Sequence, residues 1–170
     1  MNRIALVGFM GAGKTTVGRE LAQILGWRFR DTDQELERQT HAAASQLLQE
    51  DPAGFRRLES AVIAQLLQEE EIVLATGGGA AAREENLELL LAQAFVVYLE
   101  APVELLWSRC GGQRGESLRP LMREGFAHFR ALFQGREASY RSAHLVVDGT
   151  GEPEEIARRI IAGWRNGGWT

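Results

Sequence analysis

Short apolar segments alternate with stretches of helical periodicity along the whole chain. The short segments predict strands, because a helix needs a longer run of suitable residues. Strands separated by helices form βαβ units, so the pattern predicts an α/β fold: a five-stranded parallel sheet flanked by helices on both faces. The five strands are expected at Arg3–Val7, Trp27–Arg30, Ile72–Ala75, Phe95–Leu99 and Leu145–Val147.

The stretches between the strands repeat apolar residues at helical spacing. The first predicted helix, Lys14–Leu25, is followed by Gly26, a residue suited to a C-cap. Pro153 is suited to the first turn of a terminal helix that ends at Trp164. The other helices are expected at Gln34–Gln39, Ala43–Glu50, Phe55–Gln68, Glu84–Gln93 and Pro102–Arg109. In Phe55–Gln68, the apolar residues Leu58, Val62 and Leu66 are predicted to share one face.

Length and composition narrow the class of protein. The 170 residues show no repeat and no linker, which predicts one domain over residues 1–170. The single cysteine, Cys110, excludes an internal disulfide and fits a reducing compartment, so we expect a cytoplasmic protein. The apolar run Ile4–Val7 is too short for a signal peptide, and no run approaches the ~20 residues of a membrane span. The net charge of −4 argues against general nucleic-acid binding.

The predicted topology places the candidate chemistry at one edge of the sheet. In parallel sheets, ligands bind at the carboxyl ends of the strands. The loops after Val7, Arg30, Ala75 and Leu99 should therefore line one cleft. These loops hold a glycine-rich motif, a pair of aspartates, three consecutive glycines and Glu100.

The glycine-rich stretch GFMGAGKT, Gly8–Thr15, matches the phosphate-binding P-loop pattern G-x-x-x-x-G-K-[ST]. It follows a predicted strand and opens a predicted helix, which is the context that the motif requires. Backbone N–H groups and the helix dipole would bind phosphate oxygens, Lys14 would reach the β- and γ-phosphates, and the Thr15 hydroxyl would ligate Mg²⁺. The expected ATP-binding residues here are Gly11, Ala12, Gly13, Lys14, Thr15 and Thr16.

The rest of the chain limits the class of P-loop protein. Lys14 is the single lysine among 19 lysines and arginines, so the Asn/Thr-Lys-x-Asp motif of guanine-nucleotide switches is absent. The nearest candidate for the acidic strand end of a Walker-B ATPase is the lone Glu100, which reads better as a strand-end carboxylate. Kinases of small acceptors remain. Asp31 and Asp33 could contact Mg²⁺ and an acceptor hydroxyl, or could cap the following helix.

Five motifs in order give the chain a resemblance to the shikimate kinase family: GFMGAGKTT, DTD at 31–33, GFRRLE at 54–59, GGG at 77–79 and RPL at 119–121. The resemblance implies a P-loop kinase with a mobile lid, similar to nucleoside monophosphate kinases. It implies transfer of the γ-phosphoryl group of ATP to the 3-hydroxyl of shikimate, giving shikimate 3-phosphate and ADP, with one Mg²⁺ per subunit. It also implies a step toward chorismate and the aromatic amino acids, and a monomer.

The resemblance also implies roles for single residues. Asp33 resembles the acid that binds the reacting hydroxyls of shikimate, and Asp31 resembles the one near Mg²⁺. Arg56 and Arg136 resemble the pair that binds the shikimate carboxylate, and Glu59 the acid that holds the first of them. The backbone against the substrate ring would be that of Gly77, Gly78 and Gly79. Arg109 would stack on adenine, and Arg119 would meet the phosphates from the lid.

The segment 111–125 is rich in glycine and arginine and is bracketed by predicted helices. It reads either as a disordered insertion or, better, as a lid that brings Arg114, Arg119 and Arg123 over the phosphates. The acceptor-binding helices are expected at about 33–60.

The chain departs from the family pattern in two places. Asp51-Pro-Ala-Gly54 replaces the usual Gly-Glu before Phe55-Arg56, which can shift the start of that helix. The loop at 148–153 lacks the adenine-contacting arginine of some relatives, so adenine would rest on Arg109 and backbone. Two alternatives stay open: a kinase of another small polyol acid such as gluconate, and a non-catalytic nucleotide-binding regulator of the same fold.

Overall fold

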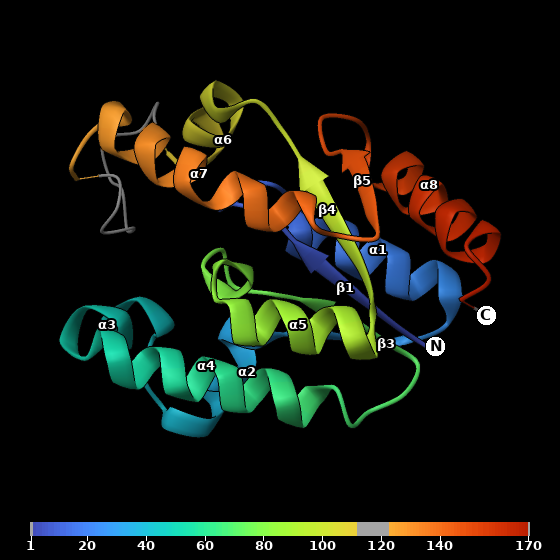
Figure 1. The fold of residues 1–170 in the computed structure, drawn as a ribbon, viewed down its shortest axis with the longest axis horizontal. Coiled ribbons are helices and arrows are strands. Elements are labelled where there is room, and N and C mark those ends of the chain that lie inside the picture. Colours follow the sequence, from blue (N-terminus) through green and yellow to red (C-terminus); the bar gives the residue numbers. More distant parts are fainter. Residues whose placement is uncertain (1, 112–122, 170) are drawn as a thin grey trace.

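The computed structural model describes residues 2–111 and 123–169. Its five strands form one sheet in the order β2-β3-β1-β4-β5, and all neighbouring strands are parallel (Figure 1). The predicted parallel α/β fold is confirmed. The strands are β1 (Arg3–Val7), β2 (Arg28–Asp31), β3 (Ile72–Ala75), β4 (Phe95–Glu100) and β5 (Leu145–Asp148).

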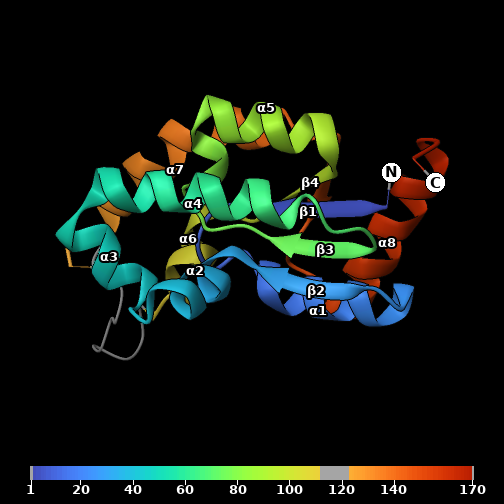
Figure 2. The ribbon, with the colours of Figure 1, turned by 90° about the horizontal axis from the view of Figure 1, so that it is seen from below.

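Helices cover both faces of this sheet. Figure 2 shows α4, α5 and α7 on one side and α1 on the other, where α1 packs against α8. The helices are α1 (Lys14–Leu25), α2 (Thr32–Thr40), α3 (Ala44–Glu50), α4 (Pro52–Leu66), α5 (Glu84–Gln93), α6 (Val103–Arg109), α7 (Phe126–Arg141) and α8 (Pro153–Asn166), with a 3₁₀ turn η1 at Ala80–Ala82.

The three central strands are buried along their whole length apart from Arg3 and Glu100 at their ends. Their apolar side chains form the core together with α1, α5 and α8. The outer strand β2 is different, because Arg28 and Arg30 bring charge to the sheet edge and pair with Glu69 at 2.8 Å each. Charged side chains on an edge strand discourage pairing with another chain.

The helix α4 departs from its predicted form at both its start and its buried face. It begins at Pro52 rather than Phe55, because Pro52 fits the first helical turn and the Asp51 carboxylate accepts a hydrogen bond from the Gly54 N–H at 2.9 Å. The segment Asp51-Pro-Ala-Gly54, where the chain departs from the family pattern, thus forms the start of α4. On the predicted apolar face, Val62 and Leu66 are buried but Leu58 is 42% exposed, and Glu59 takes the buried position beside it.

No helix within 2–111 and 123–169 is long and apolar enough to cross a membrane.

Candidate active site

The P-loop connects β1 to α1 at the carboxyl edge of the sheet. Gly13 adopts a left-handed conformation, with φ of 90°, immediately before α1. No side chain of the described residues caps α1, so its first N–H groups face the loop and can bind an anion. The Lys14 ammonium lies over this loop and donates to the carbonyls of Gly8 at 2.8 Å and Phe9 at 2.9 Å. The predicted P-loop therefore has the geometry that phosphate binding needs.

Asp31 joins the end of β2 to the P-loop. One of its carboxylate oxygens accepts from the Thr15 hydroxyl at 2.9 Å. The other oxygen accepts from the backbone N–H of Asp33 at 3.0 Å and thereby caps α2. The helix-cap interpretation of Asp31 is therefore confirmed, and its contact with Mg²⁺ stays a prediction. A hydroxyl and a carboxylate oxygen side by side match the oxygen donors that Mg²⁺ prefers, with remaining positions left to phosphates and water.

Asp33 sits in the first turn of α2, on the side toward the sheet edge. Burial raises the pKa of its carboxyl to about 6, and the negative charges of Asp31 and Glu59 add to that shift, while the ammonium of Lys14 opposes it. A carboxyl group with such a pKa can accept a proton near neutral pH. Its surroundings thus suit contact with a reacting hydroxyl.

The three consecutive glycines lie directly against the side chains that the sequence placed in the acceptor site. The Gly77 N–H donates to the Thr32 hydroxyl at 2.9 Å. A Cβ atom at Gly77 would be 2.9 Å from an oxygen of Asp33 and an oxygen of Glu59. A Cβ at Gly79 would be 2.6 Å from Nη1 of Arg56. Only glycine lets the backbone approach these polar groups so closely.

Glu59, one helical turn after Arg56 on α4, holds the Arg56 guanidinium in place. Its Nη1 donates to Glu59 Oε2 at 2.7 Å. Glu59 is only 1% exposed, and its second oxygen, Oε1, has no hydrogen-bond partner within the described part of the chain. Among the described residues, the guanidinium makes no other hydrogen bond, and a planar guanidinium suits a carboxylate.

Arg136, the second arginine assigned to the acceptor, lies on α7. Its guanidinium lies 5.6 Å from the centre of the Phe9 ring. The positive charges of Arg136 and Arg56 both act on the hydroxyl of Tyr140, which is buried in α7. The two arginines predicted to bind one carboxylate therefore converge on one region beside the glycines.

Arg109, at the end of α6, bridges the two loops that would surround a nucleotide base. Its guanidinium donates to the carbonyl of Gly11 in the P-loop at 3.3 Å and to that of Gly149, after β5, at 3.4 Å. The loop after β5 has no arginine of its own, and Arg109 lies beside it. The adenine contact that the resemblance implies for Arg109 stays a prediction. Glu100 does not join the site, because its carboxylate pairs with Arg141.

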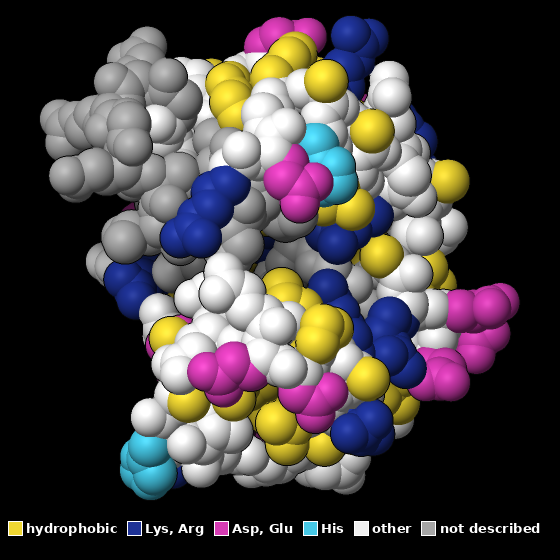
Figure 3. Space-filling view, turned by 90° about the vertical axis from the view of Figure 1, so that its left-hand side faces the viewer, with side chains coloured by type: hydrophobic (Ala, Val, Ile, Leu, Met, Phe, Trp, Pro, Cys, Tyr) yellow, Lys and Arg dark blue, Asp and Glu magenta, His cyan; other side chains and the backbone are white. Residues whose placement is uncertain are grey.

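Positive side chains gather at this edge of the molecule. Figure 3 looks onto the left-hand side of Figure 1 and shows lysine and arginine side chains around a hollow in that face. Arg119 and Arg114 lie outside the described residues, as does most of the predicted lid at 111–125, so their roles stay predictions.

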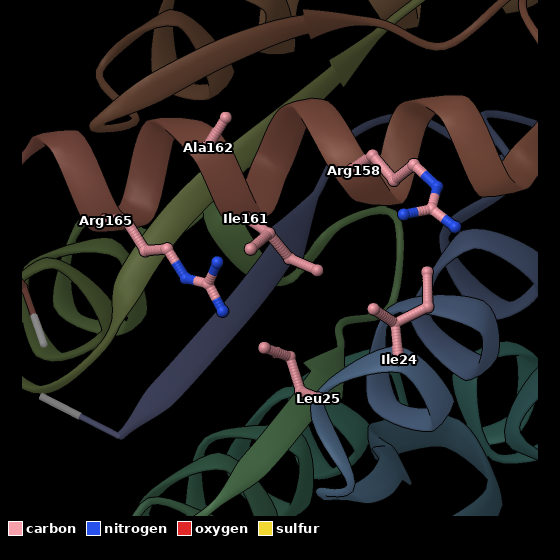
Figure 4. Close-up of a pocket in the computed structure, with 6 residues that line it drawn as sticks. All are labelled: Ile24, Leu25, Arg158, Ile161, Ala162 and Arg165. Carbon is pink, nitrogen blue, oxygen red and sulfur yellow. The ribbon is translucent and has the colours of Figure 1, made fainter.

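A separate cavity of about 250 Å³ lies between α1 and α8 (Figure 4). It is lined by Ile24, Leu25, Arg158, Ile161, Ala162 and Arg165. It adjoins the C-terminal end of α1, whereas the P-loop adjoins the other end of this helix. The cavity is therefore not part of the candidate active site.

Comparison with known proteins identifies the family. The family model described as shikimate kinase matches residues 10–164. The chain belongs to the shikimate kinase family. It is 36% identical over 163 residues to a shikimate kinase of Persephonella marina, covering 95% of this chain and 98% of that protein.

Solved structures agree with this membership of the shikimate kinase family. A shikimate kinase from Acinetobacter baumannii, solved in complex with shikimate, superposes with a TM-score of 0.90 at 39% identity and covers 98% of this chain and 94% of that one. A gluconokinase from Sinorhizobium meliloti reaches a TM-score of 0.63 at 18% identity, covering 97% of this chain and 92% of that one. That lower identity shows a shared fold alone.

Two residues of this candidate site were missed in the sequence analysis. Thr32 is 1% exposed, and its hydroxyl accepts from Gly77, so it ties α2 to the glycines. Tyr140 is fully buried and its hydroxyl donates to the Gly78 carbonyl. The spacing of Arg136 and Tyr140, one helical turn, was the available signal that both side chains share a face of α7.

Gly79→Ala is expected to raise the KM for shikimate at least about tenfold, by displacing the charged hydrogen-bond donor Arg56. Gly79 has a φ of −97°, which alanine adopts without strain, and the added methyl meets the flexible end of Arg56 rather than backbone. The backbone should therefore tolerate the methyl, but displacing Arg56 from the buried Glu59 carboxylate should lower the melting temperature as well. Gly135→Ala is the matched control, since a Cβ there meets nothing within 4 Å. A normal shikimate KM in Gly79→Ala, measured by steady-state kinetics, would contradict the assigned position of Arg56.

Proposed function

We propose that this member of the shikimate kinase family transfers the γ-phosphoryl group of ATP to the 3-hydroxyl of shikimate, giving shikimate 3-phosphate and ADP. The observation that carries the proposal is the cluster beside the P-loop: Asp33 and Arg56 lie against the three glycines, and Arg136 acts on Tyr140, whose hydroxyl binds the same loop. Shikimate presents one carboxylate and three hydroxyls. The two guanidinium groups fit the carboxylate, and the Asp33 carboxylate fits the hydroxyls.

The residues of the P-loop would bind and orient the donor. Backbone N–H groups at the start of α1 would hold the β-phosphate, with Lys14 leaving the Gly8 and Phe9 carbonyls to contact the phosphates. Arg109 would support adenine between the two loops that it bridges. Thr15 and Asp31 would hold Mg²⁺, which neutralises charge on the phosphate chain when bound.

The acceptor residues would orient the attacking hydroxyl. Asp33 would accept a hydrogen bond from the 3-hydroxyl, hold it in line with the γ-phosphoryl group and take its proton. Arg56, Arg136 and the glycines would fix the ring, which converts an encounter of two substrates into an oriented complex. Closure of the predicted lid would bring Arg119 to the phosphoryl group, where positive charge stabilises the transition state.

An ADP-release assay with several acceptors tests the proposal. Shikimate should support ATP turnover, and gluconate should not. Turnover with gluconate at a comparable kcat/KM would favour the polyol-acid alternative. Nucleotide binding without turnover on any acceptor would favour the regulatory alternative. Family membership and the assembled cluster of Asp33 and the two arginines support the first outcome.

The kcat/KM for shikimate is expected to fall as the pH is lowered through about 6, because Asp33 must be ionised to accept the hydroxyl proton and its pKa lies at about 6. Glu59→Gln removes a negative neighbour that raises this pKa, so the inflection should move to lower pH. Initial rates at low shikimate concentration across the acidic and neutral range give the profile. An inflection at the same pH in Glu59→Gln would show that Asp33 is not the group whose titration controls kcat/KM.

A further inference from the structure

Tyr140 connects α7 to the glycine loop at the centre of the site. Its side chain is fully buried, and its hydroxyl donates a hydrogen bond to the carbonyl of Gly78. Burial raises the pKa of this hydroxyl to about 12, although the positive charge of Arg136 and its hydrogen bond to the hydroxyl oppose the shift. The hydroxyl therefore donates to the loop and lies within reach of the positive charge of the Arg136 guanidinium, one helical turn earlier on α7.

The loop that receives this hydrogen bond is in contact with the whole acceptor site. Gly78 packs on the P-loop, since a Cβ atom there would be 3.2 Å from the Met10 nitrogen. The adjoining glycines lie against Asp33 on one side of Gly78 and Arg56 on the other. A displacement of the Gly78 carbonyl would consequently move the backbone on which the substrate ring is proposed to rest.

We propose that Tyr140 is a positioning residue for the acceptor. Its hydroxyl sets the glycine loop and the Arg136 guanidinium at a fixed separation, so that ring and carboxylate of the acceptor are bound together. The inference rests on the proposed function, because it assigns a support to the same acceptor site. It concerns acceptor binding specifically: within residues 2–111 and 123–169, the hydroxyl makes no hydrogen bond to the residues proposed to bind the nucleotide phosphates.

The neighbouring Tyr98 provides a matched control. The two rings lie 5.3 Å apart, and both residues are buried. The Tyr98 hydroxyl, however, is buried with no hydrogen-bond partner among the residues that the structure describes. Each Tyr→Phe substitution removes one hydroxyl from the same aromatic pair, but only Tyr140→Phe breaks the connection between α7 and the loop.

The experiment compares Tyr140→Phe, Tyr98→Phe and the wild type by steady-state kinetics in both substrates and by thermal unfolding. We expect Tyr140→Phe to raise the shikimate KM by about tenfold, the effect of losing one well-placed hydrogen bond in a buried site, with the ATP KM within about twofold of wild type. The Tyr98→Phe variant should match the wild type in both KM values.

Three results would overturn the inference. The first is an unchanged shikimate KM in Tyr140→Phe, and the second is an equal rise in both KM values with a lowered melting temperature, which indicates general loss of packing. The third is an equal shikimate KM defect in Tyr98→Phe. All three leave the proposed function intact, because the wild type turns over shikimate in each. A wild type that leaves shikimate unphosphorylated overturns the proposed function and this inference together.

Discussion

Asp33→Asn is expected to lower kcat by roughly 10²–10⁴-fold, the range of a positioned acid–base group. Asparagine keeps the size and one acceptor oxygen, but it loses the charge and the ability to take a proton. The loose transition state of phosphoryl transfer needs no strong base, yet the hydroxyl must be oriented and its proton must leave. Nucleotide binding should change little, because the Asp33 carboxylate lies against Gly77.

Asp31→Asn is the matched comparison, two residues away on the same loop. Its carboxylate contacts the Thr15 hydroxyl, the position assigned to Mg²⁺, so raised Mg²⁺ should partly restore its activity. The same addition should not restore Asp33→Asn. Steady-state kinetics of both variants over a Mg²⁺ titration decide the assignment. A near-normal kcat in Asp33→Asn, or rescue of that variant alone, would show that the two roles are wrong or reversed.

Asp33→Asn should also stabilise the fold at neutral pH. The pKa of Asp33 is raised from 3.8 in its ordinary state to about 6 in the folded protein, so the folded protein binds this proton more tightly than the unfolded chain. The contribution of this group to stability therefore falls as the pH rises from about 4 to about 6. Asp33→Asn removes that loss. The gain in melting temperature should be present at neutral pH and vanish near pH 4, an exchange of activity for stability.

Modification of Lys14 by an amine reagent is expected to abolish turnover. Lys14 is the single lysine of the chain, so only it and the α-amino group can react. Its ammonium would contact the β- and γ-phosphates, where a compact charge stabilises the developing transition state. Mg·ATP should protect it, since bound phosphates would occupy the same ammonium.

Mass spectrometry of labelled peptides, paired with residual activity, measures this effect. The loss of activity should follow the labelled fraction of Lys14 and not that of the N-terminus. Labelling in the presence of Mg·ATP controls for damage by the reagent itself. A protein fully labelled at Lys14 that still phosphorylates its acceptor would rule out the catalytic interpretation of the P-loop.

Local patterns in the sequence were sufficient to predict most of the sheet. The bounds of β1 and β3 agree with the prediction, because both are continuous apolar runs closed by polar or glycine residues. Periodicity failed on α4, where Leu58 is exposed while the charged Glu59 is buried. A buried carboxylate follows from the need to hold Arg56, a functional requirement that hydrophobic spacing does not reveal.

The parts of the site that belong to a known sequence motif, or that follow a predicted strand, could be predicted. The P-loop matches a pattern with a known geometry, and topology alone brings Asp31 and the glycines to the same edge. Tyr140 could not be found in this way, because its role depends on a contact with Gly78, far away in sequence. Such contacts follow from the packing of α7 over η1. The spacing of Arg136 and Tyr140 signals a shared helix face but does not reveal the contact with Gly78.

The most direct test of the account is the structure of the product formed from ATP and shikimate. Proton and phosphorus NMR of the reaction mixture identify which ring oxygen carries the phosphate. The account predicts a single monoester at the 3-hydroxyl, formed in equal amount to ADP. Release of inorganic phosphate in place of an ester, or an ester at another oxygen, would contradict the assigned arrangement of Asp33, Arg56 and Arg136 around the acceptor.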